Sequence, residues 1–152
     1  EEGSVHLQQF PALPADWHDP SLGARWDRIR EIRRVITGAL ERARADGLIR
    51  ASLQAKPVVY LDNNVQQMLP AAQWAELAIV SDIEFALTEA SPGAFRLAEV
   101  EGVAAHVAAA TGEKCARCWK VLEEVGRHAA HPALCARCVD AVESGLVCKA
   151  AE

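Results

Sequence analysis

The sequence lacks any apolar run close to the ~18 residues that a membrane-spanning helix needs. Its N-terminal segment is acidic and polar, without the apolar stretch of a secretory signal peptide. We therefore expect a cytoplasmic protein with no membrane partner. Structural disulfides are unusual in that reducing compartment, and the cysteine count of five is odd.

Recognisable catalytic patterns are absent as well. No serine–histidine–acid spacing, glycine-rich phosphate loop or pair of carboxylates stands out from the rest of the sequence. His106 is alone in a run of alanine and valine, where a core or edge position is expected. The sequence therefore predicts no catalytic residue in this chain.

Positive charge is scarce in the middle of the chain. Residues 62–112 contain seven acids and a single base, Arg96, although the whole chain has 16 bases and 21 acids. The resulting net charge of −5 argues against broad non-specific binding to nucleic acids. A local basic surface at either end of the chain remains possible.

Hydrophobic periodicity predicts a long amphipathic helix over residues 21–46, with Ser21 as its N-cap and Gly47 just past its end. One flank of this helix carries Arg30, Arg33 and Arg34. These arginines fit a solvated face, paired with acids three residues away, or a surface that presents positive charge to phosphates.

The segment after this helix changes to shorter patterns. Residues 56–61 and 77–87 are predicted as strands, with two short helices between them, and Pro70 opens the second helix. Residues 94–110 fit either a strand or a helix. The pattern predicts a small α/β unit with two or three strands.

Four cysteines form the most specific motif. Cys115 and Cys118 make one CxxC pair, Cys135 and Cys138 make a second, and sixteen residues separate the pairs. This spacing is typical of a four-thiolate zinc site, in which two tight turns supply a tetrahedron with Zn–S distances of about 2.3 Å. Four protein ligands leave no open position on the metal, so one structural Zn²⁺ is expected.

Other readings of the cysteines fit less well. A redox CxxC is normally single and near a βαβ unit, disulfides suit another compartment, and iron–sulfur sites space their cysteines differently. His128 or His131 could replace a cysteine, although four thiolates already complete the shell. Cys148 is expected to be a free thiol or a packing residue.

The fold class predicted from these patterns is α+β: a long helix, a small α/β unit and a C-terminal Cys₄ finger of the hairpin type. The expected divisions are residues 1–55, 56–110 and 111–152. In the finger, bases alternate with an aromatic residue, which suits phosphates and stacked nucleobases. The residues concerned are Arg117, Trp119, Lys120, Arg127 and Arg137. Alternatively, the indole covers the metal site.

Several segments resemble one known family. Gly112–Trp119 and His131–Val139 match GEKCxRCW and HPxLCxRC in the C-terminal zinc-binding tail of bacterial isoleucyl-tRNA synthetases. Ser4–Pro11 resembles the family's SVHL-x-x-FP. Trp26–Leu61 resembles the last long helix of its anticodon-binding bundle and the turn that follows. The resemblance covers nearly the whole chain in the family's order.

The resemblance implies the C-terminal region of a class I isoleucine–tRNA ligase, whose ATP- and Mg²⁺-dependent catalytic site and editing site lie outside this chain. It implies binding to tRNA(Ile) near the anticodon stem-loop, the remainder of the synthetase chain as a second partner, and a monomer. The candidate tRNA contacts are Arg30, Arg33, Arg34, Lys114, Arg117, Trp119, Lys120 and Arg127.

Two alternatives stay open. Formamidopyrimidine-DNA glycosylases share the finger spacing, but they need a catalytic N-terminal proline, where this chain has Glu1, and a helical segment before the finger. A zinc-stabilised protein-interaction module is favoured by Trp119 and by the acidic middle segment.

Overall fold

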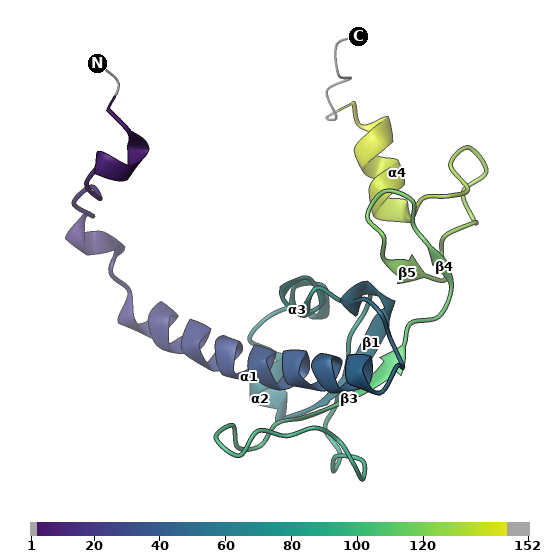
Figure 1. The fold of residues 1–152 in the computed structure, drawn as a ribbon, viewed down its shortest axis with the longest axis horizontal. Coiled ribbons are helices and arrows are strands. Elements are labelled where there is room, and N and C mark those ends of the chain that lie inside the picture. The colour runs from purple at the N-terminus through teal and green to yellow at the C-terminus, as the bar shows by residue number, and fades with distance from the viewer. Residues whose placement is uncertain (1–2, 146–152) are drawn as a thin grey trace.

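A computed structural model describes residues 3–145 and confirms the α+β fold class (Figure 1). The 3₁₀ helices are η1 (Val5–Leu7), η2 (Ala15–Trp17) and η3 (Ser52–Gln54). The α-helices are α1 (Pro20–Ala45), α2 (Asn63–Gln66), α3 (Ala71–Ala78) and α4 (Ala136–Glu143). The strands are β1 (Ala55–Tyr60), β2 (Glu84–Ala86), β3 (Ala104–Ala109), β4 (Glu113–Lys114) and β5 (Val121–Leu122). Within the described range, no helix combines the length and the apolar character needed to cross a membrane.

Helix α1 confirms the long helix, but its N-cap is Asp19 and not Ser21 as predicted. The Asp19 carboxylate accepts hydrogen bonds from the backbone N–H groups of Ser21 and Leu22 at 2.9 and 3.0 Å. Pro20 occupies the first helical position, where its missing N–H costs nothing. The cap therefore lies one residue before the proline. The helix ends where predicted, before Gly47, which has a φ of 75°.

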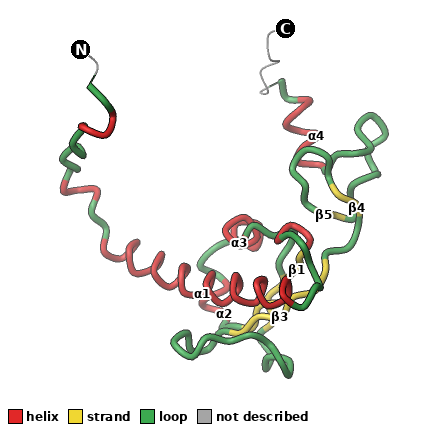
Figure 2. The backbone as a smooth tube through the Cα atoms, in the orientation of Figure 1, coloured by secondary structure: helices red, strands yellow, loops and turns green. Residues whose placement is uncertain are grey.

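Strand β1 is the centre of a three-stranded mixed sheet in the order β2-β1-β3. Its strands β1 and β3 are yellow in Figure 2. It runs parallel to β2, with Val59 opposite Phe85, and antiparallel to β3, with Val59 opposite Ala105. Buried and half-buried residues alternate along β1 because successive side chains point to opposite faces. Helix α1 packs on the sheet through its apolar face.

The strand predicted over residues 77–87 is wrong in its first half. Helix α3 continues to Ala78 and ends at Ile79, which has a left-handed φ of 57°. Only Glu84–Ala86 then form β2. A short apolar run is compatible with either a buried helix end or a strand, so the pattern alone could not separate them.

Residues 94–110 adopt the strand alternative. They contain β3, and Phe95 forms an isolated antiparallel bridge to Ala105 of that strand. Pro70 precedes α3 as its N-cap, so this helix begins at Ala71, one residue later than predicted.

Two separate apolar clusters lie in the described chain. The larger joins α1, α3 and the sheet and includes the buried Ile32, Val59 and Trp74. The smaller lies in the finger, where Val125 packs against cysteines of both CxxC pairs. Because α1 contributes to the larger cluster from Ile29 onward, the second half of the predicted 1–55 segment shares a core with the α/β unit. The proposed divisions near residues 55 and 110 remain predictions.

Candidate metal centre and nucleic-acid surface

Two short elements bring the four predicted ligands together. Cys115 and Cys118 lie in the turn between β4 and β5, whereas Cys135 caps α4 and Cys138 lies in its first turn. All four sulfur atoms lie within 4.8 Å of one another, and three of these cysteines are fully buried. The Sγ atoms of Cys118 and Cys135 are 3.7 Å apart. A tetrahedron with Zn–S distances of about 2.3 Å has edges of about 3.8 Å, so the cluster fits this ion.

Hydrogen bonds hold the first CxxC turn in shape. The Trp119 N–H donates to the Cys115 carbonyl and the Cys115 N–H donates to the Lys120 carbonyl, both at 2.9 Å. The Cys135 N–H points to the Cys115 sulfur at 3.4 Å. Donors to sulfur offset the negative charge that thiolates concentrate around a metal. The chemistry of the donor set therefore agrees with its geometry.

Burial and nearby N–H groups also shift the pKa values of two of these thiols. Burial acts to raise the pKa of Cys115, but backbone N–H groups directed at its sulfur outweigh burial and lower the pKa to about 6. Burial raises the pKa of Cys135, assisted by the neighbouring thiols. One sulfur of the cluster is thus stabilised as a thiolate, the form that binds metals.

The two nearby histidines lie outside this cluster. The rings of His128 and His131 stack with centroids 5.6 Å apart. Their Nε2 atoms lie 3.9 and 3.6 Å from Glu143 Oε1. Among the residues that the structure describes, the four cysteines are the one group with metal-binding geometry. Cys148 lies outside the described residues.

Trp119 is the most prominent aromatic residue on the finger. Its side chain is 60% exposed, and its φ of 66° is unusual for a residue with a bulky side chain. Lys114 Nζ lies 5.0 Å from the centroid of the indole, within the range of a cation–π contact. More than half of this residue is therefore accessible to solvent.

The basic candidates of the finger differ in their surroundings. Lys114, Arg117 and Arg127 are exposed, and Lys120 is half-buried. Arg117 Nη1 lies 3.7 Å from the Cys138 sulfur, so this guanidinium is also part of the metal centre's surroundings. The structure thus brings Lys114, Arg117, Trp119 and Lys120 together around one CxxC turn.

The arginine candidates of α1 already have partners within the chain. Arg30 pairs with Asp27 at 2.7 Å, and Arg34 pairs with Glu99 at 2.6 Å. Arg33 Nε donates to the Leu77 carbonyl at 2.7 Å. The pair of Arg30 agrees with a solvated helix face. Arg33 and Arg34 instead link α1 to residues far away in the chain.

Contacts that the sequence did not reveal connect the finger to the rest of the molecule. The Ser81 hydroxyl lies between the Leu53 carbonyl, at 2.5 Å, and the Val121 N–H, at 2.6 Å. Arg137 Nη1 lies 3.1 Å from Glu76 Oε1. These partners are 28 to 61 residues apart in the chain, and no local pattern marks them.

The comparisons with known proteins agree with this geometry. Residues 112–141 match the family model described as "Zinc finger found in FPG and IleRS". The chain is 46% identical over 144 residues to an isoleucine–tRNA ligase of Gluconobacter oxydans, covering 95% of the chain. It is 44% identical over 135 residues to the ligase of Brucella abortus strain 9-941 and 45% identical over 138 residues to that of Mesorhizobium japonicum, each match covering 88% of the chain.

The matched part is a small share of these relatives. The chain spans 14% of the length of each of the three ligases. Over nearly its whole length the chain is similar to the C-terminal region of isoleucine–tRNA ligases, and its residues 112–141 match the family model of the zinc finger found in FPG and IleRS.

Proposed function

We propose that the finger binds one structural Zn²⁺ through Cys115, Cys118, Cys135 and Cys138. The separation of the sulfurs, their burial and the N–H group directed at the Cys115 sulfur support this ligand set. When bound, the ion supplies a cross-link that stabilises a segment with a very small apolar cluster of its own. The surrounding N–H groups and Arg117 offset the charge of the thiolates.

We further propose that this chain is the tRNA-binding C-terminal region of an isoleucine–tRNA ligase and contacts tRNA(Ile) near the anticodon stem-loop. The observation that carries the proposal is the exposed Trp119 beside basic residues on a finger of the type found in IleRS. ATP- and Mg²⁺-dependent aminoacylation would belong to other parts of such an enzyme.

The finger offers two kinds of contact to an RNA. An exposed indole provides a flat surface on which a base can stack, and the bases around it provide charge for phosphates. The hydrogen bond from the Trp119 backbone N–H to the Cys115 carbonyl fixes the backbone of Trp119 to the metal-binding turn. Folding of the finger around the metal would therefore place stacking and charged groups in advance of binding.

The candidate contacts do not contribute equally in this proposal. Lys114, Lys120 and Arg127 form no ion pair among the described residues, so their charges are available to phosphates. Arg30 and Arg34 would first have to leave their acidic partners. We therefore assign most of the electrostatic contribution to the finger and a smaller one to α1, with Arg33 acting mainly on stability.

The remainder of the synthetase chain is the second proposed partner. Phe10 is fully exposed, Trp17 is 71% exposed, and both lie on the N-terminal arm that leads away from the body of the molecule (Figure 1). Large apolar side chains gathered on one segment are typical of a surface that another part of the protein covers.

The salt dependence of tRNA binding tests the proposed function. We expect the zinc-loaded chain to bind tRNA(Ile) at low salt, with affinity falling as salt rises because phosphate contacts release counterions. Replacing Lys120 or Arg127 with glutamine should weaken binding and reduce the slope of log affinity against log salt by about 1 per lost phosphate contact.

Arg28→Gln is the matched control, since it removes a charge that Glu31 already neutralises and Arg28 is not a candidate tRNA contact. Its slope should remain close to that of the unmodified chain. Absence of binding at low salt would refute the proposed function. Capture of a protein partner by a chain that does not bind tRNA would favour the interaction-module alternative.

A further inference from the structure

The finger and the body of the molecule do not share an apolar core. The finger's cluster is centred on Val125 and the cysteines, whereas the cluster of α1, α3 and the sheet is separate from it. An apolar interface therefore does not determine how the finger is oriented relative to α1. Besides the connecting chain, polar contacts link the two parts.

One of these contacts is buried. Ser81 is 4% exposed, and among the polar and charged residues within 3–145 it is the one that is buried as a whole. Its hydroxyl donates to the Leu53 carbonyl at 2.5 Å and accepts from the Val121 N–H at 2.6 Å. Its own N–H donates to the Ala55 carbonyl at 3.2 Å, at the start of β1. The side chain of Ser81 thus joins the first residue of β5 to η3, and its backbone bonds to the first residue of the central strand β1.

A second polar contact between the finger and the body is an exposed ion pair, which stabilises less than a buried hydrogen bond. Arg137 of α4 pairs with Glu76 of α3, but the two side chains are 60% and 57% exposed. Ion pairs this exposed contribute little because water and salt screen them. A buried N–H or carbonyl that loses its hydrogen-bond partner, in contrast, carries a substantial penalty.

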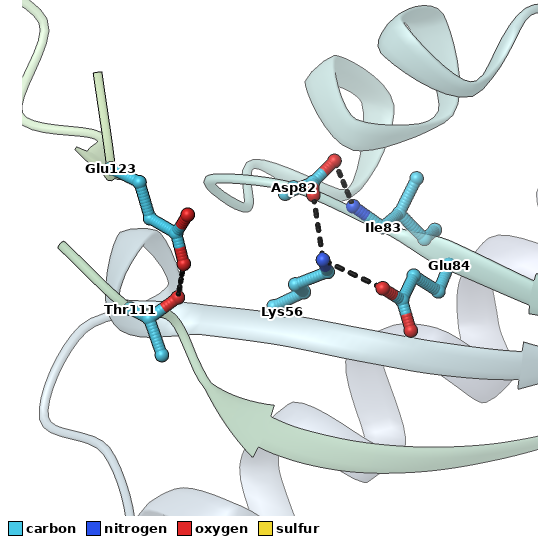
Figure 3. A network of polar contacts seen from close by, with 6 residues as sticks. All are labelled: Lys56, Asp82, Ile83, Glu84, Thr111 and Glu123. Carbon is cyan, nitrogen blue, oxygen red and sulfur yellow. Dashed lines mark hydrogen bonds and ion pairs between the residues drawn. The ribbon is translucent and has the colours of Figure 1, made fainter.

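A hollow lies next to Ser81, lined by its neighbour Asp82 and by its hydrogen-bond partner Val121. An open pocket of about 330 Å³ separates the two parts and is lined by Lys56 and Asp82 on one side and Leu122 and Glu123 on the other. Figure 3 shows that the polar side chains here bond within their own part. Lys56 Nζ contacts the carboxylates of Asp82 and Glu84 at 3.1 and 2.7 Å, and Thr111 donates to Glu123 at 2.7 Å. Neither group crosses the pocket from sheet to β5.

We propose that Ser81 is a positioning residue whose hydroxyl sets the orientation of the finger relative to α1. Val121 lies two residues after Trp119 and directly after Lys120, so the hydrogen bond holds the end of the loop that presents both side chains. The effect on RNA binding rests on the proposed function; the effect on orientation does not.

Residual dipolar couplings of backbone N–H groups measure this orientation directly. In the unmodified zinc-loaded chain, couplings from α1 and the sheet and couplings from the finger should fit one common alignment tensor. In Ser81→Ala the finger should require a separate tensor of reduced magnitude, with zinc content unchanged. A common tensor in Ser81→Ala would overturn the proposal.

Two matched variants separate this role from a general loss of stability. Ser91→Ala removes a buried hydroxyl oxygen that forms no hydrogen bond among the described residues, and it should leave the common tensor intact. Arg137→Gln removes the exposed contact across the same boundary and should also leave it intact at physiological salt. A separate finger tensor in either control would contradict the role assigned to Ser81.

Hydrogen exchange provides a test without any substitution. The Val121 N–H should be protected in the unmodified chain, because its partner is a buried hydroxyl. Exchange as fast as that of exposed loop amides would overturn the proposal.

Binding to tRNA then tests the functional consequence. Ser81→Ala should bind tRNA(Ile) roughly three- to tenfold more weakly, because a finger free to reorient must be ordered on binding. The slope of log affinity against log salt should stay unchanged, since no phosphate contact is removed. Unchanged affinity in a variant with a reoriented finger would refute this consequence, whereas failure of the unmodified chain to bind tRNA would refute only the proposed function.

Discussion

Replacing Gly112 with alanine should disrupt the finger from the start of its hairpin. Gly112 precedes β4 and has a φ of 108°, where side chains are strained. A Cβ atom there would lie 2.3 Å from the Leu122 carbonyl carbon and 2.5 Å from the Glu123 nitrogen. Both are backbone atoms, so the two strands would have to separate.

The magnitude follows from these two effects. Backbone strain of this kind costs about 1–3 kcal/mol, and a steric clash in a packed position adds about 1–3 kcal/mol. Gly126→Ala isolates the strain, because Gly126 has a φ of 97° but a Cβ there would meet nothing within 4 Å. The clash alone should therefore lower the zinc affinity of Gly112→Ala by roughly 5- to 150-fold relative to Gly126→Ala.

Competition with a chelator measures both affinities under the same conditions. The unmodified chain and the two variants should rank in the order unmodified, Gly126→Ala, Gly112→Ala. If the two variants agreed within about twofold, the clash would contribute less than about 0.5 kcal/mol. The close approach of β4 and β5 would then not limit the finger's stability, and the reasoning would be refuted.

Other predictions concern the metal and helix α1. Replacing any one of the four cysteines with serine should lower zinc content from about one ion per chain and unfold the tail, while circular dichroism retains most of the α1 signal. Gly23→Ala should raise the unfolding temperature, because alanine is favoured over glycine by about 0.5–1 kcal/mol in a helix. Gly38→Ala should lower the temperature relative to Gly23→Ala, since its Cβ would lie 2.5 Å from the Phe95 ring. The N–H of Leu22 lowers the pKa of Asp19 below its usual 3.8, so the cap's contribution is present above that pH and is lost as pH falls through the lowered pKa. In Asp19→Asn, the amide shifts of the first turn of α1 should lose this acid dependence.

The long helix and the sulfur cluster could be predicted because local spacing determines both. Apolar residues three and four apart define the face that α1 buries, including Ile29, Ile32 and Ile36. A CxxC turn fixes two sulfurs by itself, and the hairpin between β4 and β5 supplies the shape of the first turn. Each of these features can be identified without knowledge of the distant parts of the chain.

Features that depend on distant partners could not be predicted in the same way. The arginines of α1 have the spacing of a phosphate-binding surface, but Arg34 meets Glu99 sixty-five residues away. Ser81 resembles an ordinary loop serine in sequence, and its partner Val121 is forty residues away. Tertiary packing decides whether such side chains face solvent, another strand or a ligand.

The most direct test of the account is to find where tRNA touches the chain. Ultraviolet crosslinking of tRNA(Ile) to the zinc-loaded chain, followed by mass spectrometry of the peptides, reads out the contact without substitution. The account predicts a major crosslinked peptide within residues 114–127, containing the exposed Trp119. Crosslinks confined to α1, or an unchanged pattern after zinc is removed, would contradict it.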